Sequence, residues 1–186
     1  MKITNTLYVT TRQEWRDWLA AHYQSEAEVW LIYYRKATGK ARIPYNTAVE
    51  EALCCGWIDS INKGMDEERL AQRFTPRKLK SDYSQTNIER LRKLVAAGRV
   101  MPEVQASLSD LLTQEFDYPE DIVAALRAHD EAWRNFQRYA GSYQRIRIAY
   151  VETARKRPGE FEKRLNNLIQ KTAQNKQFGF GIEEYY

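Results

Sequence analysis

Apolar residues recur at two different spacings along this chain. Residues 28–36 (EVWLIYYRK) are rich in aromatic and β-branched side chains, which predicts a strand inside a sheet. Two further apolar segments, 57–61 and 69–74, flank an Asn62-Lys63-Gly64 turn, the pattern of a β-hairpin. From residue 119 onward the spacing is helical. The chain is therefore predicted to be α+β, a small antiparallel sheet with packed helices, followed by an all-helical C-terminal subdomain.

Helix start and stop signals give the remaining elements. Capping boxes at Thr11–Glu14 and Thr47–Glu50 predict helices that end near Tyr23 and Gly56. A further helix that begins at a Ser84 or Thr86 cap and ends at Gly98 is expected, with others over 102–113 and in four segments from Pro119 onward, and residues 3–10 are expected to form a first strand. The predicted organisation is an α+β domain over 1–113, a helical subdomain over 118–176 and a partly ordered tail over 177–186.

Composition changes this picture little. The chain is 43% hydrophobic and 29% charged, as in a globular protein, and no apolar run approaches the ~20 residues of a membrane span. The N-terminus lacks the apolar core of a signal peptide, so we expect a cytoplasmic protein without membrane insertion.

Charge is distributed unevenly around a net value of +4. Residues 101–133 hold eight acids and one base, whereas residues 134–176 hold eleven bases and three acids. Such asymmetry can mark a nucleic-acid face, or two neighbouring groups of helices that complement each other, and we favour the second interpretation.

Cofactor and metal sites are not expected. Cys54 and Cys55 are adjacent and read as reduced, buried thiols, and the two histidines lie too far apart in sequence to suggest a zinc site. The eight glycines match neither the dinucleotide nor the P-loop spacing.

A basic, hydroxyl-rich loop before the helix that ends at Gly98 is the most plausible binding site. A helix start offers free N–H groups and a partial positive charge, which attract anions. The loop is either purely structural or an anion site, in which Arg77 converges with Ser81 and the N–H groups near Ser84. Its candidate ligand-binding residues are Arg73, Thr75, Arg77, Lys78, Ser81 and Ser84.

Asp59 is the weak candidate for a catalytic residue. A carboxylate amid Trp57, Ile58 and Ile61 needs a partner, and Arg73 on the facing strand is the expected one. A structural ion pair is favoured over a catalytic acid, and no catalytic motif is recognisable.

These segments resemble a known family. The run FTPRKLKSDYSQTNIERLRKLVAAGRV, preceded by EEALCCGWIDS, and the C-terminal AYVETARKRPGEFEKRLNNLIQK resemble the bacterial YdeI/OmpD-associated, or bacteriocin-protection, family over about residues 26–175. Tyr83 stands where tryptophan is usual, and Val100 precedes the expected methionine. The motif adds Asn87 to the candidate ligand-binding residues.

The resemblance implies a bacterial cytoplasmic protein with no assigned reaction or cofactor and a role in stress or bacteriocin tolerance. Three hypotheses follow. The first is a non-enzymatic binding protein for a small anionic ligand. The second is a small enzyme acting on a phosphorylated or carboxylated metabolite through Asp59. The third is a nucleic-acid binder that uses the basic C-terminal helices.

Overall fold

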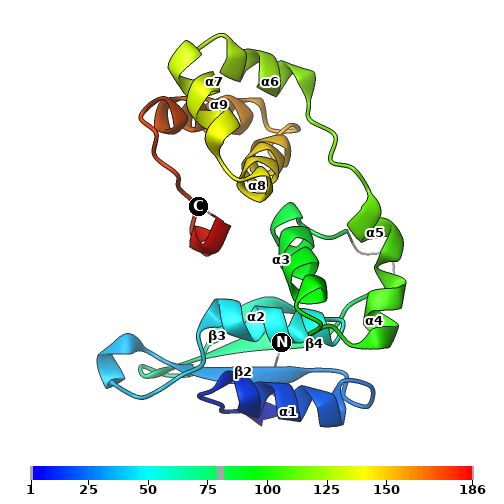
Figure 1. Cartoon of the computed structure of the whole chain (residues 1–186). Coiled ribbons are helices and arrows are strands. Elements are labelled where there is room, and N and C mark those ends of the chain that lie inside the picture. The colour runs from blue at the N-terminus through cyan, green and yellow to red at the C-terminus, as the bar shows by residue number, and fades with distance from the viewer. Residues whose placement is uncertain (1, 79–81, 186) are drawn as a thin grey trace. The chain divides into compact units, whose positions relative to one another are not determined.

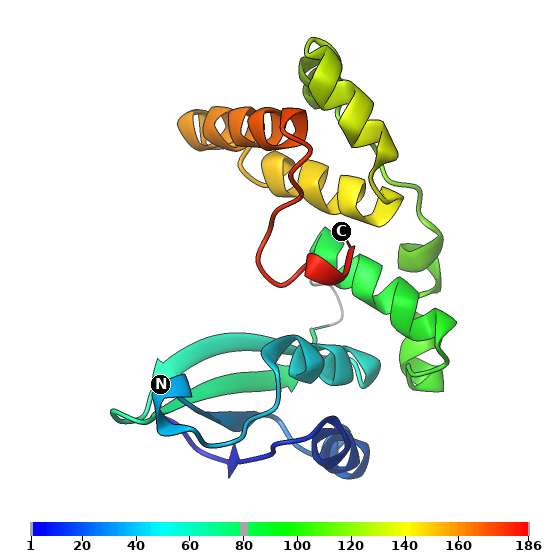
Figure 2. The ribbon, with the colours of Figure 1, turned by 60° about the vertical axis from the view of Figure 1, so that its left-hand side comes forward.

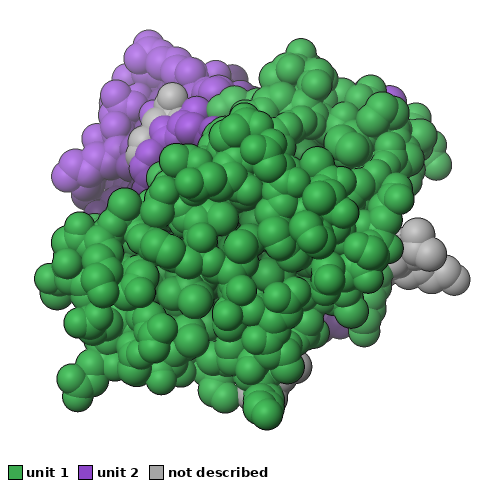
Figure 3. Space-filling model, turned by 90° about the horizontal axis from the view of Figure 1, so that it is seen from below, with its two compact units in different colours: residues 1–83, 90–112 green, residues 84–89, 113–186 purple. Residues whose placement is uncertain are grey.

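The structure is a computed structural model that describes residues 2–78 and 82–185, and it divides into two compact units. The first unit comprises residues 1–83 and 90–112, and the second comprises residues 84–89 and 113–186 (Figure 3).

A four-stranded sheet forms the centre of the first unit (Figure 1). The strands are β1 (Thr6–Leu7), β2 (Val29–Tyr34), β3 (Trp57–Gly64) and β4 (Arg69–Pro76), in the spatial order β1-β2-β4-β3. Strand β4 is antiparallel to both β2 and β3, whereas β1 joins the edge of β2 in parallel. The predicted α+β class is confirmed, and the parallel β1 makes the sheet mixed.

The β3–β4 hairpin turns later than the sequence suggested. Asn62, Lys63 and Gly64 still pair with β4, and Figure 2 shows the two strands side by side as a twisted ribbon. The bend falls after them, where the Asp66 carboxylate accepts the backbone N–H groups of Glu68 (3.0 Å) and Arg69 (2.8 Å). The turn predicted at Asn62–Gly64 is therefore wrong, because an aspartate that caps its own turn outweighs the glycine signal.

Two helices pack against one face of β2. Helix α1 (Arg12–His22) begins with the predicted capping box of Thr11 and Glu14. Helix α2 (Tyr45–Cys54) begins after Pro44 without a side-chain cap, so the capping box predicted at Thr47 is wrong. The indole N–H of Trp15 donates to the Ala48 carbonyl at 3.0 Å and joins the two helices.

Aromatic rings fill the core beneath these helices. Trp15 stacks on Trp18 with ring centroids 5.3 Å apart, and Trp18 meets Trp57 edge-on at 5.9 Å. Val29 and Leu31, which are fully buried on β2, belong to the same cluster.

Glu51 is a buried carboxylate surrounded by arginines. Its side chain is 0% exposed and pairs with Arg12 at 2.6 Å, with Arg16 at 2.7 Å and with Arg99. Transferring a charged group from water into the protein interior costs free energy. The carboxylate is tolerated there because several charged partners bind it. These pairs tie α1 and the segment after α3 to α2.

The segment from 84 to 113 is helical. Helix α3 (Gln85–Ala96) is capped by Ser84, whose hydroxyl accepts the Asn87 N–H at 3.3 Å. The helix predicted over 102–113 is instead two short helices, α4 (Pro102–Ser107) and α5 (Ser109–Thr113). The Ser107 hydroxyl donates to the Val104 carbonyl at 2.7 Å, and such side-chain bonds compete with the helical ladder.

The second unit is helical, as predicted. Its helices after residue 113 are α6 (Glu120–Arg127), α7 (Asp130–Arg138), α8 (Gly141–Glu152) and α9 (Pro158–Ala173), followed by the short η2 (Glu183–Tyr185). The expected partly ordered tail folds back, because Ile182 and Tyr185 are buried with Tyr143 and Ile146 in a small core of their own.

A candidate ligand pocket in the helical unit

Arg73 of the predicted loop site is held by a carboxylate of the protein. Its guanidinium lies 2.5 Å from Glu28, and both side chains are partly exposed. The Asp59–Arg73 pair expected from the sequence is wrong. In the sheet Arg73 lies opposite Trp30, whereas Asp59 lies opposite Phe74. Adjacent residues of a strand point to opposite faces, so Arg73 and Asp59 face away from each other.

Arg77 is engaged within its own loop. Its guanidinium carbon lies 3.6 Å from the centroid of the Tyr83 ring, and its Nη2 donates to the Asp82 carbonyl. Thr75 lies in β4 opposite Ile58, and Lys78 is exposed after the strand. Ser81 lies outside the described residues. Ser84 and Asn87, at the start of α3, belong to the second unit, so the predicted residues do not all fall within one unit.

Asp59 has a tyrosine partner. The Tyr45 hydroxyl, at the start of α2, donates to Asp59 Oδ2 at 2.5 Å. Desolvation raises the pKa of Tyr45 and also that of Tyr33, whose hydroxyl is buried without a hydrogen-bond partner among the described residues. This cluster holds one carboxylate and two protonated phenols in the first unit.

The two cysteines are buried free thiols, as predicted. Desolvation raises the pKa of Cys54 to about 11 and that of Cys55 to about 12. At neutral pH both remain protonated, which makes them poor nucleophiles.

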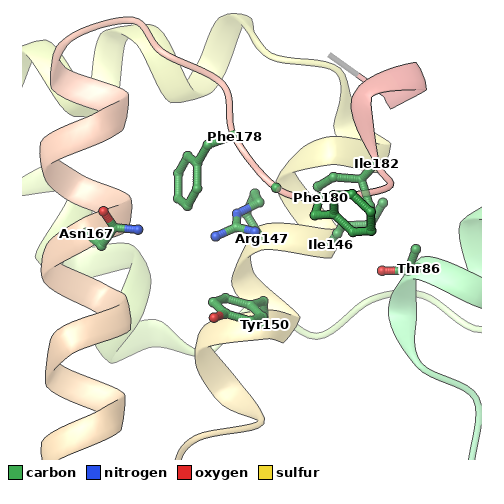
Figure 4. Close-up of a pocket in the computed structure, with 9 residues that line it drawn as sticks. Thr86, Ile146, Arg147, Tyr150, Asn167, Phe178, Phe180 and Ile182 are labelled. Carbon is green, nitrogen blue, oxygen red and sulfur yellow. The ribbon is translucent and has the colours of Figure 1, made fainter. Parts of the chain in front are cut away.

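A pocket of about 390 Å³ opens in the second unit between α8, α9 and residues 178–182 (Figure 4). Its volume lies within the range of small-molecule sites. Ile146 and Ile182 contribute apolar surface, and Thr86 and Asn167 contribute polar groups. The charged residue of the lining is Arg147.

Arg147 lies between two aromatic rings at this pocket. Its guanidinium carbon is 3.8 Å from the centroid of Phe178 and 4.6 Å from that of Tyr150, and Figure 4 shows Asn167 across from it. Only 5% of Arg147 is exposed. Aromatic faces attract a guanidinium electrostatically, so the two rings hold its position.

Phe180 forms the rim of the pocket on a turn between two glycines. Gly179 and Gly181 have φ values of +133° and +74°, in the region that favours glycine. A Cβ at Gly179 would lie 2.6 Å from Ile182 Cδ1, so that position has no room for a side chain. The turn leaves the Phe180 ring 94% exposed while Ile182 beside it is buried.

Several of the basic residues over 134–176 pair with acidic side chains. Arg145 binds the buried Glu89 with two bonds of 2.7 Å, and Arg155 binds Asp121 at 2.5 Å. Arg134 and Arg164 pair with acids on their own helices. The pair between Arg155 and Asp121 joins the basic segment of the sequence to helix α6 of the acidic segment.

Within residues 2–78 and 82–185, no three histidine, cysteine or acidic side chains gather as a metal-ion site. In the same residues, no helix combines the length and the apolar character that crossing a membrane requires.

The pocket was missed from the sequence because it joins side chains from separate helices. In the sequence, Arg147 is one of eleven basic residues over 134–176, and residues 177–186 are interpreted as a tail. A usable signal is the repeat Phe178-Gly179-Phe180-Gly181, since a large apolar residue between two glycines marks a ring held on a tight turn.

Two family models match consecutive parts of the chain. Residues 7–107, more than half of its length, match the family described as Domain of unknown function (DUF8412). Residues 115–175 match the family described as Bacteriocin-protection, YdeI or OmpD-Associated, which confirms the resemblance for the C-terminal part. No curated protein and no solved structure matches the chain.

Proposed function

This chain belongs to the family of the Domain of unknown function (DUF8412) and carries a YdeI or OmpD-Associated region, and from this premise we propose that it is a non-enzymatic binding protein. Its ligand is a small organic anion with a planar ring, which binds in the Arg147 pocket of the second unit. The pocket replaces the basic loop as the principal anion site.

The observation that carries this proposal is the position of Arg147. The side chain is buried between Phe178 and Tyr150 at a pocket that also presents an exposed ring, Phe180. A fixed guanidinium suits a forked contact with a carboxylate or phosphate. Apolar walls and an aromatic rim suit a flat ring, so both parts of such a ligand find a complementary surface.

Calorimetry on the full chain tests the proposal. We expect benzoate or phenyl phosphate to bind and benzamide, a neutral ring of similar size, to bind at least about tenfold more weakly. Arg147→Lys keeps the charge but loses the fork, so it should weaken binding. Phe180→Ala should weaken binding without loss of stability, because the ring is exposed. Equal binding of benzoate and benzamide would contradict an anion site.

The basic loop is tested by the same measurement. Arg77→Ala and Lys78→Ala remove cations of the first unit, and we expect them to leave the affinity for benzoate unchanged. A loss of affinity in these variants at unchanged stability would return the anion site to the loop.

The description of the matched family supports a role in bacteriocin tolerance. We propose that ligand binding serves this role. A strain lacking the gene should then be complemented by the wild-type protein but not by Phe180→Ala, which folds and lacks only the rim of the pocket. Full complementation by Phe180→Ala would separate the pocket from tolerance.

Acid–base chemistry at Asp59 is the second candidate function. The 2.5 Å bond from Tyr45 and the nearby buried hydroxyl of Tyr33 favour it, since a carboxylate that a phenol holds in place can accept a proton from a bound molecule. A screen of phosphorylated and carboxylated metabolites tests this function. Turnover that Asp59→Asn and Tyr45→Phe both abolish would establish it, and no turnover would exclude it for the metabolites screened.

A further inference from the structure

A second pocket of about 580 Å³ adjoins the Arg147 pocket in the second unit. Tyr150 and Asn167 line both pockets. The remaining lining of the second pocket comes from α9, residues 160–170.

The second pocket is polar where the first is aromatic. Asn166, Asn167 and Gln170 bring three exposed amides, each of which can both donate and accept hydrogen bonds. This lining suits a ligand segment that carries hydroxyl groups, whereas Ile146, Ile182 and Phe178 of the first pocket suit a ring.

Positive charge prevails in the second pocket as well. Its ionic residues are Lys163, Arg164 and Glu160, and the carboxylate of Glu160 is bound to Arg164 at 2.8 Å. Arg164 is held further by bonds to the Tyr150 carbonyl (2.8 Å) and to the Thr153 hydroxyl (3.1 Å). Two cations against one acid leave this pocket with a net charge of about +1 at neutral pH.

Tyr150 links the two cationic regions. Its ring lies 4.6 Å from the guanidinium carbon of Arg147 and 4.0 Å from that of Arg164. The ring is thus fixed from both sides, while 42% of the residue remains exposed. A ligand that spans both pockets would pass along this tyrosine.

We infer that the two pockets together bind one elongated ligand, in which a planar ring that carries a carboxylate is joined through a hydroxyl-bearing linker to a phosphate. This is the chemistry of a nucleoside monophosphate with an acidic base. The ring lies against Phe178 and Phe180 with its carboxylate at Arg147, the linker contacts the amides of α9, and the phosphate lies near Lys163. The inference rests on the proposed function, because it adds a second subsite to the Arg147 pocket.

Calorimetry with the full chain and three probes tests the inference. Benzoate reports the first pocket, orotidine, whose base carries a carboxylate, adds the linker, and orotidine monophosphate adds the phosphate. We expect the monophosphate to bind at least about tenfold tighter than orotidine or benzoate. Lys163→Ala should weaken the monophosphate about fivefold or more and leave benzoate within about twofold. Phe180→Ala should weaken both.

Lys156→Ala is the matched control, since it removes an exposed cation of the same unit that lines neither pocket. Suppose that benzoate binds, that the monophosphate binds no tighter, and that Lys163→Ala does not change its affinity. The second subsite is then wrong and the proposed function stands. If neither benzoate nor the monophosphate binds, both the proposed function and the inference are wrong. Equal losses in Lys156→Ala and Lys163→Ala, or tighter binding to single-stranded DNA with a steep salt dependence, would show diffuse attraction and overturn the subsite.

Discussion

Phe180 depends on its glycine neighbours for its place in solvent. An exposed aromatic ring is unfavourable, because its apolar surface stays in contact with water. The positive φ values of Gly179 and Gly181 allow the chain to reverse so tightly that Phe180 points outward beside the buried Ile182. The geometry of the rim is thus decided by residues without side chains.

Gly179→Ala should therefore destabilise the C-terminal segment. The new methyl group would meet Ile182 at 2.6 Å in a backbone conformation that alanine avoids, at a cost of about 1–3 kcal/mol. Thermal unfolding should show a lower Tm, and calorimetry should show weaker binding of benzoate. Gly159→Ala, in α9 with open space around the site, should leave Tm unchanged or raise it. An unchanged Tm in Gly179→Ala would show that the turn relaxes freely.

The buried thiols make a prediction about reactivity. With pKa values raised to about 11 and about 12, Cys54 and Cys55 hold little thiolate at pH 8. A disulfide reagent such as DTNB should react with the unfolded chain rapidly and with the native chain only slowly. The double Cys→Ser variant should keep ligand affinity and lose about 1–3 kcal/mol of stability, because it buries two hydroxyls. Loss of binding in a fully folded double variant would give the thiols a role.

At the level of elements, hydrophobic spacing located most strands and helices, but it did not define their register. The strand around Trp30 and the helix capped by Thr11 follow directly from local pattern. The pairing of Asp59 opposite Phe74 depends on a bulge and on a turn placed by Asp66. A shift of one residue sends a side chain to the other face, so the partners of Arg73 and Asp59 could not be read locally.

The pair between Glu28 and Arg73 should make the sheet sensitive to acid. Hydrogen bonds from Thr4 and then Arg73 lower the pKa of Glu28 below its ordinary value of 4.5. The unfolded chain therefore binds this proton more readily. The pair's contribution to stability is present above about pH 4.5 and is lost as the pH falls through the lower native value.

Glu28→Gln should then unfold at a lower urea concentration than wild type at pH 7. We expect its free energy of unfolding to be lower by about 1 kcal/mol or less, because the pair is partly exposed. The difference should shrink as the pH falls below about 4.5. Glu67→Gln, on an exposed turn, is the control and should unfold like wild type at every pH. A gap between wild type and Glu28→Gln that does not depend on pH would assign the loss to packing.

At the scale of the whole molecule, local sequence patterns did not predict the candidate site. The predicted loop residues were contiguous, and the structure ties Arg73 to Glu28 and Arg77 to Tyr83. The pocket instead draws on α8, α9 and the segment after Phe178, which only folding brings together. Periodicity identifies the buried face of each helix, but it does not show which faces leave a cavity between them.

A fragment of residues 1–113 should not fold independently. It keeps Glu89, which is buried in the intact chain, but loses Arg145, which binds it with two hydrogen bonds. A buried carboxylate that loses these two charge-assisted hydrogen bonds is destabilising unless water reaches it. We expect a fragment without a cooperative unfolding transition, and Glu89→Gln should restore part of its stability. A soluble 1–113 fragment with native-like near-UV circular dichroism would contradict this.

The distribution of tryptophans lets each unit be observed separately. Trp15, Trp18, Trp30 and Trp57 belong to the first unit, and Trp133, next to Arg127 and Phe136, is the fifth and belongs to the second. In a Trp133→Phe variant, all indole fluorescence comes from the first unit, whereas circular dichroism at 222 nm reports helices in both. Coincident urea transitions in the two signals would show that the units unfold together, and separate transitions would give each unit its own free energy of unfolding.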